Sequence, residues 1–127
     1  MLDTDSVSYV LRGRGNVADR VVRYPPADLC ISAITLAELR FGADLLNSSR
    51  LHHSIDEFIR EIDVMPFDES CSNLYGVIAS QLQKQGSPIG KFDVAIAAHA
   101  VSIDATLVTN NVKHFSRVHG LRVENWF

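Results

Sequence analysis

The chain has 127 residues, 46% of them hydrophobic and 21% charged, which excludes an intrinsically disordered protein. This length predicts a single domain over residues 1–127, large enough to bury roughly two-thirds of its unfolded surface. The formal net charge of −3 argues against a broad basic surface that binds duplex nucleic acid non-specifically. No long apolar run or basic leader is present, so we expect no membrane span. Cys30 and Cys71 are too few for a disulfide framework, and we expect reduced thiols in a cytoplasm.

Short apolar runs alternate with helical patterns along the chain. We expect strands at residues 1–2, 29–32, 62–65, 105–109 and 121–124. We expect helices over residues 6–11, 17–24, 33–46, 50–60, 68–86 and 91–102. The first helix would be capped by Asp5 or Ser6 and the third by Ser32. This alternation, without a repeat or a linker, is typical of an α/β fold whose parallel sheet is covered on both faces.

One of these helices carries a carboxylate within an apolar stripe. Residues 91–102 contain no helix breaker, and Gly90 precedes them as punctuation. At about 100° per residue, Asp93 shares its face with Ile96 and Ala100. An ionised carboxylate removed from water costs several kcal/mol unless it is paired or bound to a metal. Asp93 therefore requires a compensating partner.

The helix over residues 33–46 repeats this feature. Ile34, Phe41 and Leu45 fall on one face of that helix, and Glu38 lies among them. We expect this face to point toward the core. Glu38 would then be a second carboxylate held at the edge of the apolar interior.

Further polar residues follow the ends of expected strands. Asp3 follows the first strand, and Thr109 and Asn111 lie at the end of the fourth. Active groups of open parallel sheets gather beyond the carboxyl ends of the strands, so Asp3, Glu38 and Asp93 are placed to converge. Two unit charges about 4 Å apart repel by on the order of 4 kcal/mol at an effective dielectric of 20, so three carboxylates need protons or a cation. Oxygen ligands select Mg²⁺ or Mn²⁺, which can polarise a phosphate and generate hydroxide from water.

Each acid taken alone also has an ordinary structural explanation. Asp3 can cap a turn, Glu38 can extend to solvent or pair with an arginine, and Asp93 can use the positive end of its helix. Only their joint occurrence favours a metal site. His99 lies off the acid face and is interpreted as a hydrogen-bonded structural histidine, and His114 as a loop residue.

Other catalytic chemistries find little support in this chain. It contains no P-loop, no G-x-G-x-x-G after a strand, no G-x-S-x-G and no paired Cys/His metal spacing. Cys30 falls in an expected buried strand and is a poor nucleophile. The basic turn with Arg12 and Arg14 is either a solvated loop or a place where a phosphate chain is neutralised.

Four motifs occur in order from the first residue to the last. They are Met1-Leu2-Asp3-Thr4, residues 31–39 (ISAITLAEL), residues 88–100 (PIGKFDVAIAAHA), and residues 107–111 (LVTNN) with 123–126 (VENW). Together they resemble the PIN domain and, within it, the VapC toxins of bacterial toxin–antitoxin pairs. Because the motifs stay in register over the whole chain, the resemblance is specific at the level of the family.

The resemblance implies a three-layer α/β/α sandwich with a parallel sheet of about five strands. It also implies an endoribonuclease dependent on Mg²⁺, or on Mn²⁺ as a substitute. The protein would form a homodimer and a toxin–antitoxin hetero-oligomer with a cognate VapB-type antitoxin, whose C-terminal segment wraps the toxin and blocks its site.

By position, the resemblance also assigns residues to the site. Asp3, Glu38 and Asp93 match the three acids that bind metal and water in the family, and Asn111 falls where many members have a fourth acid. As an amide, Asn111 can ligate a metal but cannot act as a base. Asp5 stands where the family often has Asn, which adds a negative charge. Thr4 and Thr109 are placed to orient a carboxylate or a water molecule.

We therefore expect hydrolysis of RNA phosphodiester bonds, with Asp3, Glu38, Asp93 and Asn111 as catalytic residues and the three acids as metal ligands. The alternatives are a phosphoacceptor module with an acidic pocket and an inactive interaction module. A phosphoacceptor of the receiver type needs an Asp at the end of a central strand and a later Lys. In this chain Pro66 follows the third expected strand, and Asn110 and Asn111 follow the fourth.

Overall fold

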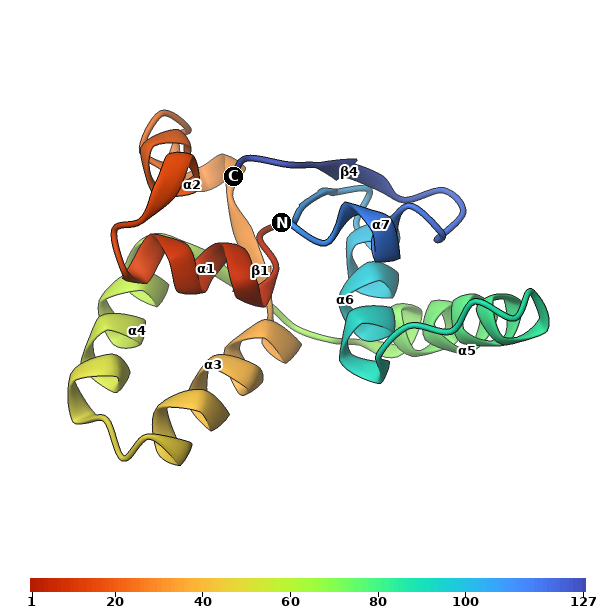
Figure 1. Cartoon of the computed structure of the whole chain (residues 1–127), viewed down its shortest axis with the longest axis horizontal. Coiled ribbons are helices and arrows are strands. Elements are labelled where there is room, and N and C mark those ends of the chain that lie inside the picture. The colour runs from red at the N-terminus through yellow and green to blue at the C-terminus, as the bar shows by residue number, and fades with distance from the viewer.

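The computed structural model describes residues 1–127 and contains helices and short strands in alternation (Figure 1). The helices are α1 (Thr4–Leu11), α2 (Gly15–Val21), the 3₁₀ turn η1 (Pro26–Asp28), α3 (Ala33–Leu45), α4 (Ser49–Glu61), α5 (Glu69–Lys84), α6 (Lys91–Ser102) and α7 (Val112–Phe115). The strands are β1 (Cys30–Ser32), β2 (Asp63–Met65), β3 (Thr106–Val108) and β4 (Arg122–Glu124). None of the helices combines the length and the apolar character that crossing a membrane requires.

The strands form two parallel pairs, β1 with β2 and β3 with β4. Leu2 connects the pairs, because it bridges Ile31 in β1 and Val108 in β3, both in parallel orientation. The parallel sheet is confirmed, but the expected count of about five strands is not. The N-terminal segment contributes only this bridging residue, since Asp3 already caps the helix that follows.

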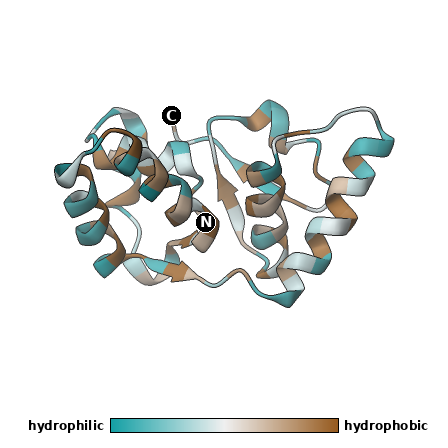
Figure 2. Ribbon diagram, turned by 90° about the horizontal axis from the view of Figure 1, so that it is seen from below, coloured by the Kyte–Doolittle hydropathy of each residue, from teal (hydrophilic) through white to brown (hydrophobic).

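Two apolar cores lie on opposite faces of these strands. Leu2, Ile31 and Val108 belong to one core, with side chains from α1 to α4, and Figure 1 shows α3 and α4 on that side. Met1 and Leu107 belong to the other, with side chains from α5, α6 and α7. Neighbouring strand residues point to opposite faces, which explains why the inner positions Leu2, Ile31, Leu107 and Val108 are all apolar. In Figure 2 the central strands are mostly brown, while the outer helices alternate between teal and brown.

The first helix begins earlier than the sequence pattern predicts. We expected Asp5 or Ser6 as its cap, but Asp3 holds that position and its Oδ1 accepts the Ser6 backbone N–H at 2.8 Å. Helix α2 is also shifted, from the expected residues 17–24 to Gly15–Val21. Ser32, by contrast, caps α3 as predicted by accepting the Ile34 N–H at 3.1 Å.

The buried face of α3 differs from the expected one. Phe41 and Leu45 are 68% and 69% exposed, whereas Thr35, Leu39 and Ala43 are buried. Both faces are largely apolar, so the period of the pattern alone does not select between them. Packing of α3 against α1 and α4 makes the choice and leaves Glu38 half-buried at the boundary, not in the interior.

His99 has the structural role that we expected. It is buried in α6, its Nδ1 lies 2.8 Å from the Ser32 Oγ, and its ring meets Phe67 edge-on. This pair ties the start of α3 to the last turns of α6. Cys30 and Cys71 are both free thiols.

Candidate active site

The four candidate site residues come together at one cavity of about 140 Å³. It is lined by Asp3, Thr4, Asp5, Glu38, Asp93, Ile96, Asn111 and Phe115. These residues come from the N-terminus, α1, α3, α6, the segment that leads into α7, and α7 itself. The cavity lies where β1 and β3 end and their helices begin, which is the edge that a parallel sheet offers to functional groups.

Asp3 is the most deeply buried acid of the cavity, at 5% exposure. Burial raises the pKa of Asp3, and hydrogen bonds from Ser6 and Thr109 lower it in part. The Ser6 hydroxyl in turn donates to the Val108 carbonyl at 3.0 Å. Asp3 therefore has two roles, because the oxygen that caps α1 also fixes the orientation of its carboxylate.

Glu38 projects from the middle of α3 to the rim of the cavity. The Thr4 hydroxyl donates to Glu38 Oε1 at 2.6 Å, which fixes one carboxylate oxygen. Burial raises the pKa of Glu38 most, and the charges of Asp93, Asp5 and Asp3 raise it further. Thr4 thus orients a carboxylate, as we expected. The negative charges of the neighbouring acids disfavour the ionised form of Glu38.

Asp93 lies in the first turn of α6, where the helix dipole favours a negative charge. It is half-buried, and burial is the main cause of its raised pKa. The charge of Asp5 acts in the same direction, whereas a protonated His114 would lower this pKa. Asp5 is itself exposed at the start of α1, so it adds negative potential from the rim.

Asn111 sits directly before α7, and its contacts fix its side chain. Its backbone N–H donates to Thr109 Oγ1 at 2.9 Å, and its Nδ2 lies 2.8 Å from His114 Nδ1. Because an amide nitrogen only donates, His114 accepts at Nδ1 in this pair. The amide oxygen of Asn111 then has no partner among the protein side chains and is free for the cavity.

Sequence reasoning missed the role of His114. We interpreted it as a loop residue, but it lies on α7 beside Asn111. The signal that could have found it is the spacing of three residues between Asn111 and His114 at the start of a helix, which places both on one face.

No Lys or Arg forms an ion pair with the acids of the cavity. The ion pairs of the chain are Arg40–Asp56, His52–Asp44, His53–Glu57 and Arg122–Asp104, none of which includes a residue of the cavity. The side chains form no group of three or more His, Cys, Asp or Glu at metal-ligand spacing. The donors themselves, carboxylate and amide oxygens, are those that a hard divalent cation prefers.

Comparisons with known proteins identify the family of this chain. The PIN domain family model matches residues 1–121. The chain is 35% identical over 127 residues to the tRNA(fMet)-specific endonuclease VapC of Shigella flexneri, covering 99% of this chain and 96% of that protein. It is 39% identical over 129 residues to ribonuclease VapC1 of Haemophilus influenzae strain R2866, again covering 99% and 96%.

A solved structure extends the likeness to three dimensions. The DNA-bound VapBC complex of Salmonella typhimurium contains a chain that superposes with a TM-score of 0.92 at 33% identity, covering 100% of this chain and 97% of that one. The protein therefore belongs to the PIN domain family and, within it, to the VapC ribonucleases.

Proposed function

We propose that this chain is a single-domain toxin of a toxin–antitoxin pair and acts as an endoribonuclease that hydrolyses RNA phosphodiester bonds. The observation that carries this function is one cavity to which four distant parts of the chain bring Asp3, Glu38, Asp93 and Asn111. No Lys or Arg forms an ion pair with Asp3, Glu38 or Asp93, and burial raises the pKa of each of these three acids. Relatives at 35% and 39% identity are named as a tRNA endonuclease and a ribonuclease.

The proposed cofactor is a divalent cation, as in PIN-domain nucleases generally. Mg²⁺, with Mn²⁺ as a substitute, suits a site made only of oxygen donors. Asp3, Glu38 and Asp93 would hold it, with the Asn111 oxygen available as a fourth donor. When bound, such an ion supplies Lewis acidity toward the phosphodiester.

The protein side chains supply orientation and a base. Thr4 holds one oxygen of Glu38, and Ser6 holds one oxygen of Asp3, so both carboxylates present their other oxygens in fixed directions. A raised pKa makes a carboxylate a better proton acceptor. We propose that Glu38 or Asp93 is the base that accepts a proton from the attacking water. Asn111 cannot accept this proton, and Asp3 is the most buried of the acids.

The proposed partner is a VapB-type antitoxin, in a hetero-oligomer that also contains a toxin homodimer. A groove of about 540 Å³, lined by Ala37, Glu38, Phe41 and Phe92, adjoins the cavity through Glu38. Phe41 and Phe92 are 68% and 59% exposed, which is unusual for side chains of this size. An antitoxin segment that covers these rings would reach the acids and block them. We expect both partners to act in the cytoplasm.

The decisive experiment is cleavage by the purified, antitoxin-free chain. Relatives in Shigella flexneri and Salmonella typhimurium are named tRNA(fMet)-specific, so transcribed initiator tRNA is the first substrate, with an elongator tRNA beside it. Each reaction is run with Mg²⁺, with Mn²⁺ and with EDTA. An Asp93→Asn protein purified in the same way exposes any contaminating nuclease.

Metal-dependent cuts at a few discrete positions, absent with Asp93→Asn, are expected. Cleavage at full rate in EDTA would overturn the assigned cofactor. If the chain cuts no RNA but melts at a higher temperature with Mg²⁺, the result would favour the alternative of a phosphoacceptor module. A chain with neither property would be an inactive interaction module.

A further inference from the structure

A second charged region lies around α2 and has the opposite sign to the cavity. Four of the twelve Lys and Arg residues of the chain fall within residues 12–23, namely Arg12, Arg14, Arg20 and Arg23. All four are exposed, and none forms an ion pair. Asp19 is the only acid in this segment. A protein with a net charge of −3 therefore carries a locally positive surface, which we call the α2 surface.

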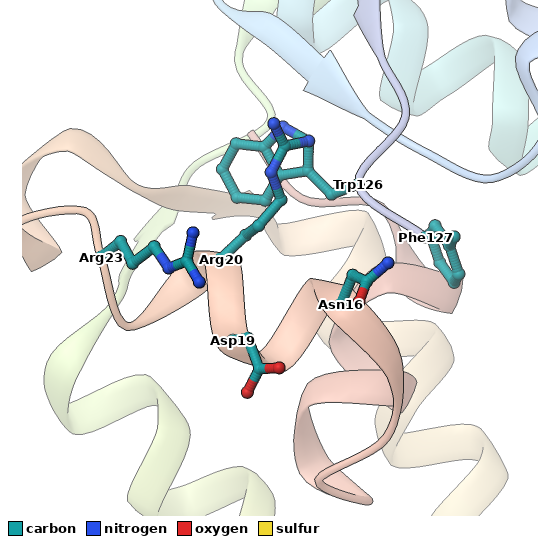
Figure 3. Close-up of a pocket in the computed structure, with 6 residues that line it drawn as sticks. All are labelled: Asn16, Asp19, Arg20, Arg23, Trp126 and Phe127. Carbon is teal, nitrogen blue, oxygen red and sulfur yellow. The ribbon is translucent and has the colours of Figure 1, made fainter.

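A cavity of about 210 Å³ lies on this surface. It is lined by Asn16, Asp19, Arg20, Arg23, Trp126 and Phe127 (Figure 3). In Figure 3 the Asp19 carboxylate points away from the two guanidinium groups, while Arg20 extends to the Trp126 ring. Trp126 is itself buried, so the cavity offers cationic groups without ion pairs, and such groups are what nucleic-acid sites use to bind phosphates.

The Arg20 side chain is fixed before any ligand arrives. Its Cζ lies 5.5 Å from the centroid of the Trp126 ring, and its Nη1 donates to the Asn125 carbonyl at 3.3 Å. Trp126 is held by stacking on Tyr24 and by a bond from its Nε1 to Glu124 Oε2 at 2.7 Å. Neither contact with Arg20 neutralises its charge, and its other N–H groups remain available. A planar, pre-positioned guanidinium suits a phosphate better than an ammonium group does.

Helix α1 links this surface to the candidate active site. Asp3 caps one end of the helix and Arg12 the other, and the eight residues between them span about 12 Å. The acid cavity repels a polyanion, so the affinity for RNA must come from positive groups outside it. The α2 surface lies within reach of the same RNA strand.

We propose that the α2 surface binds the phosphate backbone of the RNA substrate outside the cleavage site. This inference rests on the proposed ribonuclease function and names how that site gains affinity for RNA. Arg12, Arg14 and Arg23 attract phosphates by charge. Arg20, stacked on Trp126, gives one phosphate a fixed position. Contacts to the backbone hold the RNA in place and carry no sequence information.

The test compares two triple variants with the same change in charge. Arg12→Gln/Arg14→Gln/Arg23→Gln removes charge from the α2 surface. Arg50→Gln/Arg60→Gln/Arg117→Gln removes it from three exposed positions that form no ion pair. Both are made in the Asp93→Asn background, so that binding of transcribed initiator tRNA is measured without cleavage, over a range of salt concentrations. Antitoxin affinity is measured beside it.

The first triple variant is expected to bind RNA about tenfold more weakly. The slope of log affinity against log salt should become shallower by about two, at about 0.7 for each lost phosphate contact with a single strand. In the active background the loss should appear in KM. Equal losses of RNA affinity in both triple variants would show that only net charge matters, which would overturn the proposal. Unchanged RNA affinity in both variants would overturn it as well. A loss of antitoxin affinity with unchanged RNA binding would assign the surface to an acidic protein segment instead.

Arg20 requires a separate variant because it also contacts the C-terminal residues. Arg20→Lys keeps the charge but loses the planar group, and we expect about threefold weaker RNA binding with an unchanged melting temperature. RNA binding equal to that of the wild type would limit Arg20 to fixing Trp126. These binding results are independent of cleavage, so they remain distinguishable from a failure of the proposed ribonuclease function.

Discussion

The acid cavity and the α2 surface carry opposite charges, and the protein holds them in opposite ways. Asp3, Glu38 and Asp93 are buried or half-buried, burial raises their pKa values, and hydrogen bonds from Thr4 and Ser6 fix two of them. The arginines are exposed, and the side chains of Arg12, Arg14 and Arg23, unlike that of Arg20, make no hydrogen bond within the protein. Fixed, poorly solvated charges suit chemistry, whereas solvated charges suit attraction that salt can screen.

The contrast predicts that the acids control the rate of cleavage and the arginines control the affinity for RNA. The largest effect should come from substitutions of the acids. Asp3→Asn, Glu38→Gln and Asp93→Asn should each lower cleavage about 100-fold or more, because each change removes a carboxylate and keeps its shape. Affinity for RNA should stay equal or rise, since less negative charge meets the phosphates. Cleavage rates and RNA binding are measured for each variant.

Asp63→Asn is the matched control, because Asp63 is exposed on β2 and has no ion pair. Its cleavage rate should equal that of the wild type. An acid-cavity variant that cuts at the wild-type rate would remove that residue from the site. A variant that no longer folds would show that the carboxylate is needed for structure, which circular dichroism would reveal.

A smaller effect is expected where the antitoxin is proposed to cover the acids. Phe41→Ser should weaken antitoxin binding about tenfold or more, because full burial of such a side chain contributes about 1.5–3 kcal/mol. Titration of cleavage activity with the antitoxin measures the change. Val77→Ser on α5, where Val77 is 50% exposed, is the control. Unchanged inhibition of Phe41→Ser would place the antitoxin on another face.

Substitution of His114 tests whether its hydrogen bond to Asn111 contributes to cleavage. His114→Ala removes the acceptor that holds the Asn111 amide, so we expect cleavage to fall about fivefold to tenfold, mainly in kcat. His119→Ala, an exposed histidine five residues later, should leave the rate unchanged. His114→Gln should recover part of the activity, because its side chain can accept the same hydrogen bond. Equal rates for His114→Ala and the wild type would show that Asn111 needs no support.

The smallest effect concerns stability and compares a buried with an exposed histidine. Burial lowers the pKa of His99 below its ordinary value of 6.5, and the Asp68 carboxylate opposes this shift. The unfolded chain therefore takes up this proton at a higher pH than the folded chain does. The contribution of neutral His99 is complete above pH 6.5 and is lost as the pH falls, by at most about 1.4 kcal/mol per pH unit.

Thermal unfolding between pH 7.5 and pH 5 measures this effect. His99→Gln should be less stable than the wild type at neutral pH and should lose less stability as the pH falls. His119→Gln, at an exposed position without an ion pair, should keep the pH dependence of the wild type. Identical pH profiles for the wild type and His99→Gln would show that His99 does not resist protonation.

The sequence determined the alternation of helices and strands, the parallel sheet and the family, because these depend on local periodicity and on motifs. It also singled out Asp3, Glu38 and Asp93, since a carboxylate at an apolar or strand-end position is unusual wherever it occurs. The structural role of His99 followed from its position on the face of the helix opposite the acid.

Only the tertiary structure decided the features that depend on contacts between distant segments. Both faces of α3 are apolar, and its packing on α1 and α4 chose which one to bury and left Phe41 exposed. Only Leu2 of the expected first strand forms bridges, and Asp3, directly after it, caps α1. The ring under Arg20 belongs to Trp126, more than a hundred residues away. Periodicity reports only neighbours along the chain, whereas these arrangements follow from packing across the sheet.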